Sequence, residues 1–294
     1  MEWDPTQFFR DGIRPSVPFA LLVLNQPINQ RAFAALNKHA CFTICADGGA
    51  NVYYDLMKSQ DRETSDLPNA IVGDLDSILP SVRKHYESLN VTIVHDPDQY
   101  STDLMKCLKY LRANASRILH SSAENTSSSK GSTSEIESQS QAQAQSHPRL
   151  DVLILGGLGG RVDQAFSQVH HLYAMAQHED SPGELYLVSE ESISFILRTG
   201  RNVIQTPGAR RAKGSSKDTD PDGIYYLEEN IGILPISGPA VISTTGFEWD
   251  VSDWRTEMGG QISTSNHIRA DVVSVETNER VLFTAELAGR FKAR

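Results

Sequence analysis

The sequence predicts an α/β domain built on a doubly wound parallel sheet, followed by an antiparallel β-sandwich domain. Between residues 19 and 190, short and continuously apolar runs alternate with longer stretches of helical spacing, a pattern typical of a buried parallel sheet covered by helices. From about residue 192, β-branched or alternating runs are separated by Gly, Pro, Asn and Thr, which indicates antiparallel strands. We therefore divide the chain into an N-terminal extension (1–18), an α/β nucleotide-binding domain (19–190) and a β-sandwich domain (191–294).

The strands expected in the α/β domain are the continuous apolar runs, because a strand covered on both faces needs no polar alternation. In chain order they are Phe19–Asn25, Cys41–Ala46, Asn69–Gly73, Val91–His95, Asp151–Leu155 and Leu185–Ser189. In the sandwich, shorter runs are expected as strands: Ile193–Leu197, Val203–Gln205, Gly232–Pro235, Ala240–Thr245, Asp271–Glu276 and Val281–Ala285.

Helical spacing between the first strands predicts the helices that cover the sheet. They are expected over Asn29–His39, from Gly49 to Met57, and over Pro80–Leu89, Leu104–Leu119 and Arg161–Gln177. Pro80 suits the first turn of its helix, where a backbone N–H is not needed. Ser101 or Thr102 can cap the helix that follows them, and Leu104 and Cys107 belong to its apolar face.

Two polar segments interrupt this pattern. Residues 121–148 are rich in Ser, Gln and Ala and have almost no large apolar side chains. Such a segment cannot bury enough surface to offset its ordering entropy, so we expect a disordered insert. Residues 207–223 carry several Arg and Lys, which is compatible with a nuclear-targeting patch but favours a solvated loop.

The overall composition restricts the classes of function. A net charge of −10 argues against a dedicated nucleic-acid-binding protein, which needs clustered Lys and Arg. The cysteines at 41, 45 and 107 form no C-x-x-C pair, which favours a reduced, intracellular protein, and we expect Cys41 and Cys45 in the core. The acidic N-terminus is unlike a signal peptide, and no apolar run approaches the length of a membrane span. We therefore expect a cytoplasmic protein without nucleic-acid or membrane partners.

Four polar or glycine-rich segments follow predicted strands, namely Asp47–Ala50, Gly73–Asp76, Asp98–Asp103 and Gly156–Asp163. Because ligands bind at the carboxyl ends of parallel strands, these segments together predict a site at one edge of the sheet. Glycines let a backbone approach phosphate oxygens, and helix starts attract anions. Taken alone, either glycine-rich segment is also ordinary turn chemistry. The sequence has neither a Walker A loop nor a complete G-x-G-x-x-G motif.

Six aspartates fall at this predicted edge: Asp47, Asp74, Asp76, Asp98, Asp103 and Asp163. Carboxylates placed close together repel each other, and a cation removes that repulsion. Oxygen ligands without a His or Cys cluster favour magnesium over zinc, and magnesium beside acidic groups is typical of phosphoryl or pyrophosphoryl transfer. His170 and His171 are adjacent on a helix and face different directions, so we interpret them as structural.

Six ordered motifs resemble the eukaryotic thiamine pyrophosphokinase (thiamine diphosphokinase) family. They are Ala46–Asn51, Gly73–Ile78, Asp98–Asp103, Leu155–Gln164, Thr244–Gly246 with Trp249, and Ser263–Asn266. The two inserts are similar to elaborations of fungal members. The resemblance implies an α/β nucleotide-binding domain and a β-sandwich that binds thiamine. It implies Mg²⁺-dependent transfer of pyrophosphate from ATP to the hydroxyethyl group of thiamine, by in-line attack on the β-phosphorus, giving AMP and thiamine diphosphate. It also implies a homodimer whose active site is shared between subunits.

The resemblance further implies roles for individual residues. Asp74, Asp76 and Asp103 would hold magnesium, and together with Arg161 and Asp163 they are the candidate catalytic residues. The candidate ATP-binding residues are Asp47, Gly48, Gly49, Gly73, Gln99, Ser101, Thr102, Gly156, Gly157, Leu158, Gly159 and Gly160. Trp249 would stack on thiamine, and Ser265 and Asn266 would contact it. From spacing alone, a core tryptophan and a hydrophilic loop are the simpler interpretation of these three.

One position departs from the family pattern. Relatives often carry Asp-Gln-Asp-x-Thr-Asp, whereas this chain has Tyr100 in place of the middle acid. If that acid binds the metal in relatives, this chain either has one ligand fewer or uses Asp98. Two other functions stay open. A glycosyltransferase could hold a nucleotide-sugar through the acid-x-acid motif of Asp74 and Asp76, and a non-catalytic sensor of nucleotide or thiamine could have kept the same fold.

Overall fold

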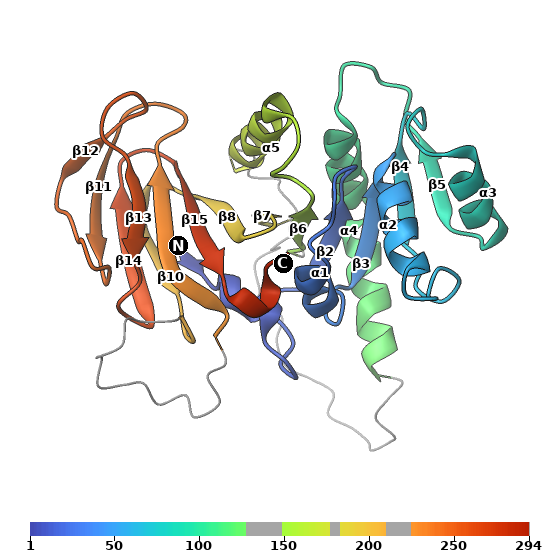
Figure 1. Ribbon diagram of the computed structural model, residues 1–294, viewed down its shortest axis with the longest axis horizontal. Helices are drawn as coiled ribbons and strands as arrows, with labels where there is room; N and C mark the ends of the chain where they lie inside the picture. The colour runs from blue at the N-terminus through green and yellow to red at the C-terminus, as the bar shows by residue number, and fades with distance from the viewer. Residues whose placement is uncertain (128–148, 177–182, 210–224, 294) are drawn as a thin grey trace, which may run out of the picture.

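The computed structural model describes residues 1–127, 149–176, 183–209 and 225–293. Within these residues the chain forms two sheets (Figure 1). The larger sheet has ten strands in the order β13-β10-β15-β8-β7-β6-β2-β3-β4-β5, and the smaller has five in the order β1-β9-β14-β11-β12. In Figure 1 the helix-covered strands lie on the right and the strand-rich half on the left. The predicted fold class is therefore confirmed.

The parallel part of the larger sheet consists of β2 (Phe19–Val23), β3 (Phe42–Ala46), β4 (Ala70–Gly73), β5 (Thr92–His95), β6 (Asp151–Leu155) and β7 (Leu185–Val188). Every neighbouring pair among these strands is parallel. Val23 lies beside Cys45 and Leu155, and Ala46 lies beside Val72. Because the register is level, the loops that follow these strands leave the sheet at the same edge.

Five helices cover both faces of this parallel part. They are α1 (Gln30–Leu36), α2 (Gly49–Lys58), α3 (Pro80–Ser88), α4 (Asp103–Ser127) and α5 (Val162–Met175). Successive residues of β2 belong to different cores, because side chains alternate between the faces of a strand. Leu21 packs in the cluster that includes Phe33 of α1, and Leu22 packs in the cluster that includes Leu104 of α4.

The start of each helix reflects its local sequence. Asn29 caps α1 by accepting a hydrogen bond from the Ala32 N–H at 3.0 Å, and Pro80 is the first residue of α3. Thr102 is the cap of α4, since its Oγ1 accepts from the Met105 N–H at 3.3 Å. The helix then continues past its predicted end to Ser127. Residues 121–127 of the expected insert are therefore helical, while 128–148 lie outside the described residues.

The antiparallel half contains β8 (Ser192–Leu197), β9 (Gly200–Gln205), β10 (Leu227–Leu234), β11 (Ala240–Thr245), β12 (Trp254–Thr256), β13 (Ser263–His267), β14 (Val272–Thr277) and β15 (Val281–Leu287). Strand β8 pairs antiparallel with β7, so one sheet runs through both predicted domains. Strands β12 and β13 were not predicted. Most of the expected polar loop, residues 210–223, lies outside the described residues.

The first residues of the chain are part of the core. Strand β1 (Glu2–Trp3) pairs with β9, and the 3₁₀ helix η1 (Pro5–Phe9) follows it. Trp3 and Phe8 are buried, and the Phe9 ring lies 4.9 Å from that of Phe291, in the 3₁₀ helix η2 (Gly289–Phe291). Cys45 is buried as predicted, and Cys41 is partly buried. In the described part of the chain, no helix combines the length and apolarity needed to cross a membrane.

Candidate active site

Asp47 lies at the centre of the carboxyl edge, directly after β3. Its side chain is fully buried, and its carboxylate accepts hydrogen bonds from the backbone N–H groups of Ser77 at 3.0 Å and Ile78 at 3.1 Å. Burial nevertheless raises the pKa of Asp47 to about 6, and the charges of Asp103 and Asp74 add to the increase. A nearby cation would therefore stabilise the ionised form of Asp47.

Gly73 allows three chain segments to approach one another closely. A Cβ at this position would lie 2.6 Å from the Cβ of Asp47 and 3.1 Å from Oδ1 of Asp103. No larger residue fits there without moving the acidic groups. Gly73 is thus required by the packing of the site, and its predicted role in binding ATP is not needed to explain it.

The turn after β4 separates the two acids of the acid-x-acid motif. Leu75 has a φ of 64°, a left-handed conformation that reverses the chain locally. The Asp76 N–H faces Oδ1 of Asp74 at 3.4 Å, whereas the Asp76 side chain is exposed and accepts a hydrogen bond from the Ser77 hydroxyl at 2.8 Å. Asp74 therefore faces inward, and the Asp76 carboxylate remains at the surface.

The first turns of α4 supply Asp103 and Lys106. The Lys106 side chain is 1% exposed, and its Nζ donates to Oδ2 of Asp74 at 3.0 Å and to Oδ1 of Asp103 at 3.2 Å. Burial opposes the charged form of Lys106, but hydrogen bonds and attraction from the two carboxylates outweigh burial and raise its pKa. In return, the hydrogen bond from Lys106 lowers the pKa of Asp74. Lys106 was not among the predicted site residues, although its spacing from Asp103 places both on one helix face.

Asp47, Asp74 and Asp103 form the acidic cluster, in which one carboxylate oxygen from each residue lies within 4.8 Å of the other two. The formal charges of the three carboxylates and the Lys106 ammonium sum to −2. Hard oxygen ligands with an excess of negative charge suit Mg²⁺, so these residues fit the predicted ion. The acidic cluster differs from the predicted ligand set, because it includes Asp47 and leaves Asp76 outside.

A pocket of about 320 Å³ opens beside the acidic cluster. Its lining combines parts of several predicted loops: Asp74, Asp103, Ser101, Thr102, Gly156, Gly157 and Gly159. Gly156 and Gly160 have φ values of 77° and 65°, which an L side chain rarely adopts. The loop after β6 therefore follows a path that depends on its glycines and that exposes backbone to the pocket.

Gly49, the first residue of α2, is required by close packing against the backbone at the end of β2, whereas Gly48, its N-cap, lies against the Asn25 side chain. A Cβ at Gly49 would lie 2.2 Å from the carbonyl oxygen of Val23, and one at Gly48 would lie 2.4 Å from Nδ2 of Asn25. The start of α2 therefore lies at the carboxyl edge, although the Ala50 and Asn51 N–H groups donate to the carbonyls of Asp47 and Gly48 and neither glycine lines the pocket.

Two further parts of the pocket were not predicted. The segment after β2 contributes Asn25 and Gln26, and α5 contributes Gln164 and Gln168. Among the described residues, the buried Oε1 of Gln168 has no hydrogen-bond partner. A buried acceptor of this kind is stabilised when a donor binds to it. The spacing of Gln164 and Gln168 on one helix face is the signal that could have identified them.

The loop from 98 to 102 is held by its own turn. Asp98 accepts hydrogen bonds from the Tyr100 N–H at 2.9 Å and from the Ser101 hydroxyl at 2.5 Å, and the latter bond is the main reason that its pKa is lowered. Asp98, Gln99 and Tyr100 are all exposed. Asp98 therefore stabilises the loop and is outside the acidic cluster.

The adjacent histidines of α5 behave differently from each other, as expected from their position on a helix. His171 is buried, and its Nε2 lies 3.0 Å from Oγ1 of Thr102, the cap of α4. Burial lowers the pKa of His171, which favours the neutral ring. His170 is exposed. This contact supports a structural role for His171 in joining α5 to the start of α4.

Arg161 and Asp163 pair with each other at the start of α5. The Arg161 Nε donates to Oδ1 of Asp163 at 3.1 Å, and its Nη2 donates to Oδ2 at 2.5 Å. Both side chains are largely exposed, and neither lines the pocket beside the acidic cluster. Leu158 and Gly160 of the same loop also lie outside that lining.

Trp249, Ser265 and Asn266 belong to the antiparallel half and do not line the pocket beside the acidic cluster. The Trp249 side chain is 55% exposed, so it is not a core tryptophan. Asn266 is buried, accepts from the Trp249 N–H at 3.1 Å and donates to the Trp249 carbonyl at 2.9 Å. Asn266 thus fixes the backbone that presents the indole. Ser265 is exposed, with a φ of 58°.

Comparison with protein families gives two matches in sequence order. A family model described as thiamin pyrophosphokinase, catalytic domain, matches residues 33–182. A second, described as thiamin pyrophosphokinase, vitamin B1 binding domain, matches residues 218–282. The first match covers the loops of the acidic cluster and the second covers Trp249, Ser265 and Asn266.

The chain is also similar to individual thiamine pyrophosphokinases, both in sequence and in structure. The thiamine pyrophosphokinase of Saccharomyces cerevisiae is 30% identical over 286 residues, a match that covers 91% of this chain and 85% of the yeast protein. Thiamine pyrophosphokinase 2 of Arabidopsis thaliana is 29% identical and covers 92% of this chain and 86% of its own length. The structure of thiamin pyrophosphokinase from Candida albicans matches with a TM-score of 0.72 at 26% identity, over 98% of this chain and 93% of that one. The yeast enzyme structure, at 23% identity and a TM-score of 0.74, supports the fold.

Proposed function

This chain belongs to the thiamine pyrophosphokinase family, and on that premise we propose that it converts thiamine and ATP into thiamine diphosphate and AMP. In this reaction the hydroxyethyl oxygen of thiamine forms a bond to the β-phosphorus of ATP and loses its proton. The bond between the β-phosphorus and the oxygen that bridges to the α-phosphorus breaks, and AMP leaves.

The observation that carries this proposal is the acidic cluster with Lys106, of which Asp74 and Asp103 line a pocket that also contains the glycines of the loop after β6. Asp47, Asp74 and Asp103 would hold Mg²⁺, and the ion would neutralise phosphate charge during transfer. Lys106 reaches two of the three carboxylates, so it balances part of their charge and holds them in position. Asp76 is exposed and lies outside the cluster, so it would contribute to holding the ion from the surface, next to Asp74.

The phosphates of ATP would lie along the carboxyl edge. Support comes from the 156–160 loop, which lines the pocket at Gly156, Gly157 and Gly159, and from the nearby helix start at Gly48 and Gly49. Ser101 and Thr102 offer hydroxyl groups in the same pocket, and Gln99 is exposed next to them. The unpartnered Oε1 of Gln168 would accept a hydrogen bond from a hydroxyl or amino group of the nucleotide, since the phosphate oxygens are themselves acceptors.

The chain's own groups need to do little covalent chemistry. A loose transition state places limited charge on the attacking oxygen, so positioning and charge neutralisation supply most of the rate enhancement. Arg161 would stabilise charge that spreads over the transferred group. Arg161 is exposed and pairs with Asp163. In the absence of nucleotide, this ion pair would hold the guanidinium in position.

Thiamine would bind against the exposed Trp249 of the antiparallel half, with Ser265 as a further contact and Asn266 holding the indole backbone. A cationic ring over tryptophan is stabilised by a cation–π interaction. Because Trp249 does not line the pocket beside the acidic cluster, we also propose a homodimer in which one subunit brings Trp249 to the acidic cluster of the other.

The function is tested by incubating the purified protein with ATP and Mg²⁺ and measuring AMP with and without thiamine. The proposal predicts AMP release that depends on thiamine and equals the thiamine diphosphate formed. A glycosyltransferase would release no AMP under these conditions, and a sensor would bind thiamine or ATP without releasing it. Either result would overturn the proposed reaction.

The shared site has a separate test. Asp74→Asn and Trp249→Ala subunits are each expected to have low activity alone. In a mixed dimer, one of the two sites would combine an intact acidic cluster with an intact Trp249, so mixing after dissociation should restore AMP release. If mixing restores nothing although mixed dimers form, the site is built within one chain.

A further inference from the structure

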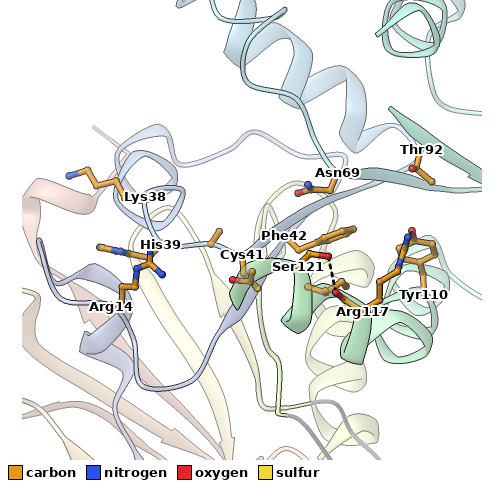
Figure 2. A pocket seen from close by; sticks show the side chains of 13 residues that line it. Arg14, Lys38, His39, Cys41, Phe42, Asn69, Thr92, Tyr110, Arg117 and Ser121 are labelled. Carbon is orange, nitrogen blue, oxygen red and sulfur yellow. Dashed lines mark hydrogen bonds between the residues drawn. The ribbon is translucent and has the colours of Figure 1, made fainter. Parts of the chain in front are cut away.

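A second pocket, of about 410 Å³, lies at the opposite edge of the parallel sheet from the acidic cluster. It is lined by the segment that enters β3, by Asn69 and Thr92 at the entries to β4 and β5, and by the later turns of α4. Figure 2 shows basic side chains on both sides of this pocket. The proposed reaction does not use this edge, so the pocket needs a separate explanation.

The charge of this pocket is positive although the chain is acidic overall. Arg14, Lys38, His39 and Arg117 line it, and none of the described residues in its lining is an aspartate or glutamate. Lys38 pairs with Asp11 at 2.8 Å, which reduces the positive charge only on that side. In a protein of net charge −10, a concave surface of this sign attracts anions.

Arg117 is held in place at the α4 side. Its Nη2 donates to the Asn114 side-chain oxygen at 3.0 Å and to the Tyr110 hydroxyl at 3.3 Å. The Tyr110 ring packs against Phe42, with ring centroids 6.4 Å apart. Because the Asn114 and Tyr110 acceptors are neutral, the guanidinium keeps its full charge for a ligand, and its fixed position lowers the entropy lost on binding.

The remaining lining is uncharged and combines hydroxyl and amide groups with apolar side chains such as Phe42 and Ile118. Thr92 and Ser121 carry hydroxyl groups, and the Ser121 hydroxyl donates to the Arg117 carbonyl at 3.0 Å, the dashed line in Figure 2. Burial raises the pKa of the Cys41 thiol to about 11, so this thiol adds no negative charge at neutral pH. The lining therefore contains guanidinium, ammonium and hydroxyl groups, the set that recognises phosphate.

We propose that this pocket is a binding site for a small phosphorylated compound, held through its phosphate groups by Arg14 and Arg117 from opposite sides. The site lies at the far end of α4 from Asp103 and Lys106. It is separate from the proposed ATP site, and the proposal stands or falls independently of the reaction.

Inorganic pyrophosphate is a suitable probe, used by calorimetry on the full chain in EDTA, where the acidic cluster repels it. The test variant is Arg14→Gln/Arg117→Gln. Arg112→Gln is the matched control, because Arg112 lies on the same helix, roughly 140° around the axis from Arg117, and does not line the pocket. Both Arg14 and Arg117 are exposed, so the double variant should keep its circular dichroism and thermal midpoint.

The expected result is saturable binding that weakens about tenfold or more in the double variant, since charge-assisted bonds are lost, and that is unchanged in Arg112→Gln. Hydrogen exchange should show protection by pyrophosphate in peptides that cover 38–42 and 110–122. Absence of binding at millimolar pyrophosphate, equal weakening in Arg112→Gln, or protection only in the 156–160 loop would each overturn the proposal.

Discussion

Replacing Lys106 by methionine tests the electrostatics of the acidic cluster. The change keeps the length of the side chain and removes its charge. Lys106 is 1% exposed, whereas the side chains of Asp74 and Asp103 are 18% and 33% exposed. Removing one partner of a fully buried ion pair costs about 3–5 kcal/mol. Because solvent screens both carboxylates partly, we expect Lys106→Met to lower the free energy of unfolding by about 2 kcal/mol.

The assay is urea unfolding at pH 7 in EDTA, followed by circular dichroism. With an m-value of roughly 2–3 kcal/mol per molar, the expected loss moves the midpoint down by about 0.7–1 M. Lys109→Met is the control. Lys109 is on the same helix, its side chain is 81% exposed, and its ion pair with Asp96 is long, at 3.9 Å. A change at such a surface position should stay within about 0.5 kcal/mol.

Mg²⁺ adds a second comparison to this experiment. Lys106 and a bound cation interact with the same two carboxylates, so Mg²⁺ should stabilise the Lys106→Met variant more than the unchanged protein. The reasoning would be refuted if Lys106→Met behaved like Lys109→Met. It would also be refuted if Mg²⁺ shifted the midpoint of both proteins equally.

Two other predictions concern Asp47 and Trp249. The pKa of Asp47 is raised to about 6, so the folded state holds its proton more tightly than the unfolded state. This stabilisation is present below about pH 4 and disappears as the pH rises to about 6, a loss of about 3 kcal/mol. Relative to Asp47→Asn, the unchanged protein in EDTA should thus become less stable between pH 4 and 7, and a constant difference would contradict the raised pKa. Trp249→Ala should raise the KM for thiamine more than the KM for ATP in the AMP-release assay, and equal increases would argue against stacking.

The parallel half of the fold could be predicted from local patterns. Strands such as β6 are continuous apolar runs with clear polar ends, and the structure places that strand at the predicted residues, Asp151–Leu155. Strand β13 could not be recognised in this way, because Ser263–His267 contains no large apolar residue. The role of Trp3 was equally inaccessible, since its burial depends on β9, about two hundred positions later in the chain.

The sequence indicated which loops meet at the candidate site, but it indicated less accurately which side chains face the acidic cluster. The rule that ligands bind at the carboxyl ends of parallel strands brought Asp47, Asp74 and Asp103 to one edge. The left-handed conformation of Leu75 turns Asp76 outward, and no sequence pattern here specified that conformation. The burial of Lys106 could not be predicted, because a lysine on an amphipathic helix ordinarily faces solvent.

The central claim is that carboxylates from separate loops hold a divalent ion for ATP at one edge of the sheet. Its most direct test is the Mg²⁺ dependence of AMP release in Asp74→Asn. We expect turnover to fall by about a hundredfold or more, with a higher Mg²⁺ requirement and an unchanged circular dichroism spectrum. Turnover close to that of the unchanged protein, at the same Mg²⁺ requirement, would contradict the account.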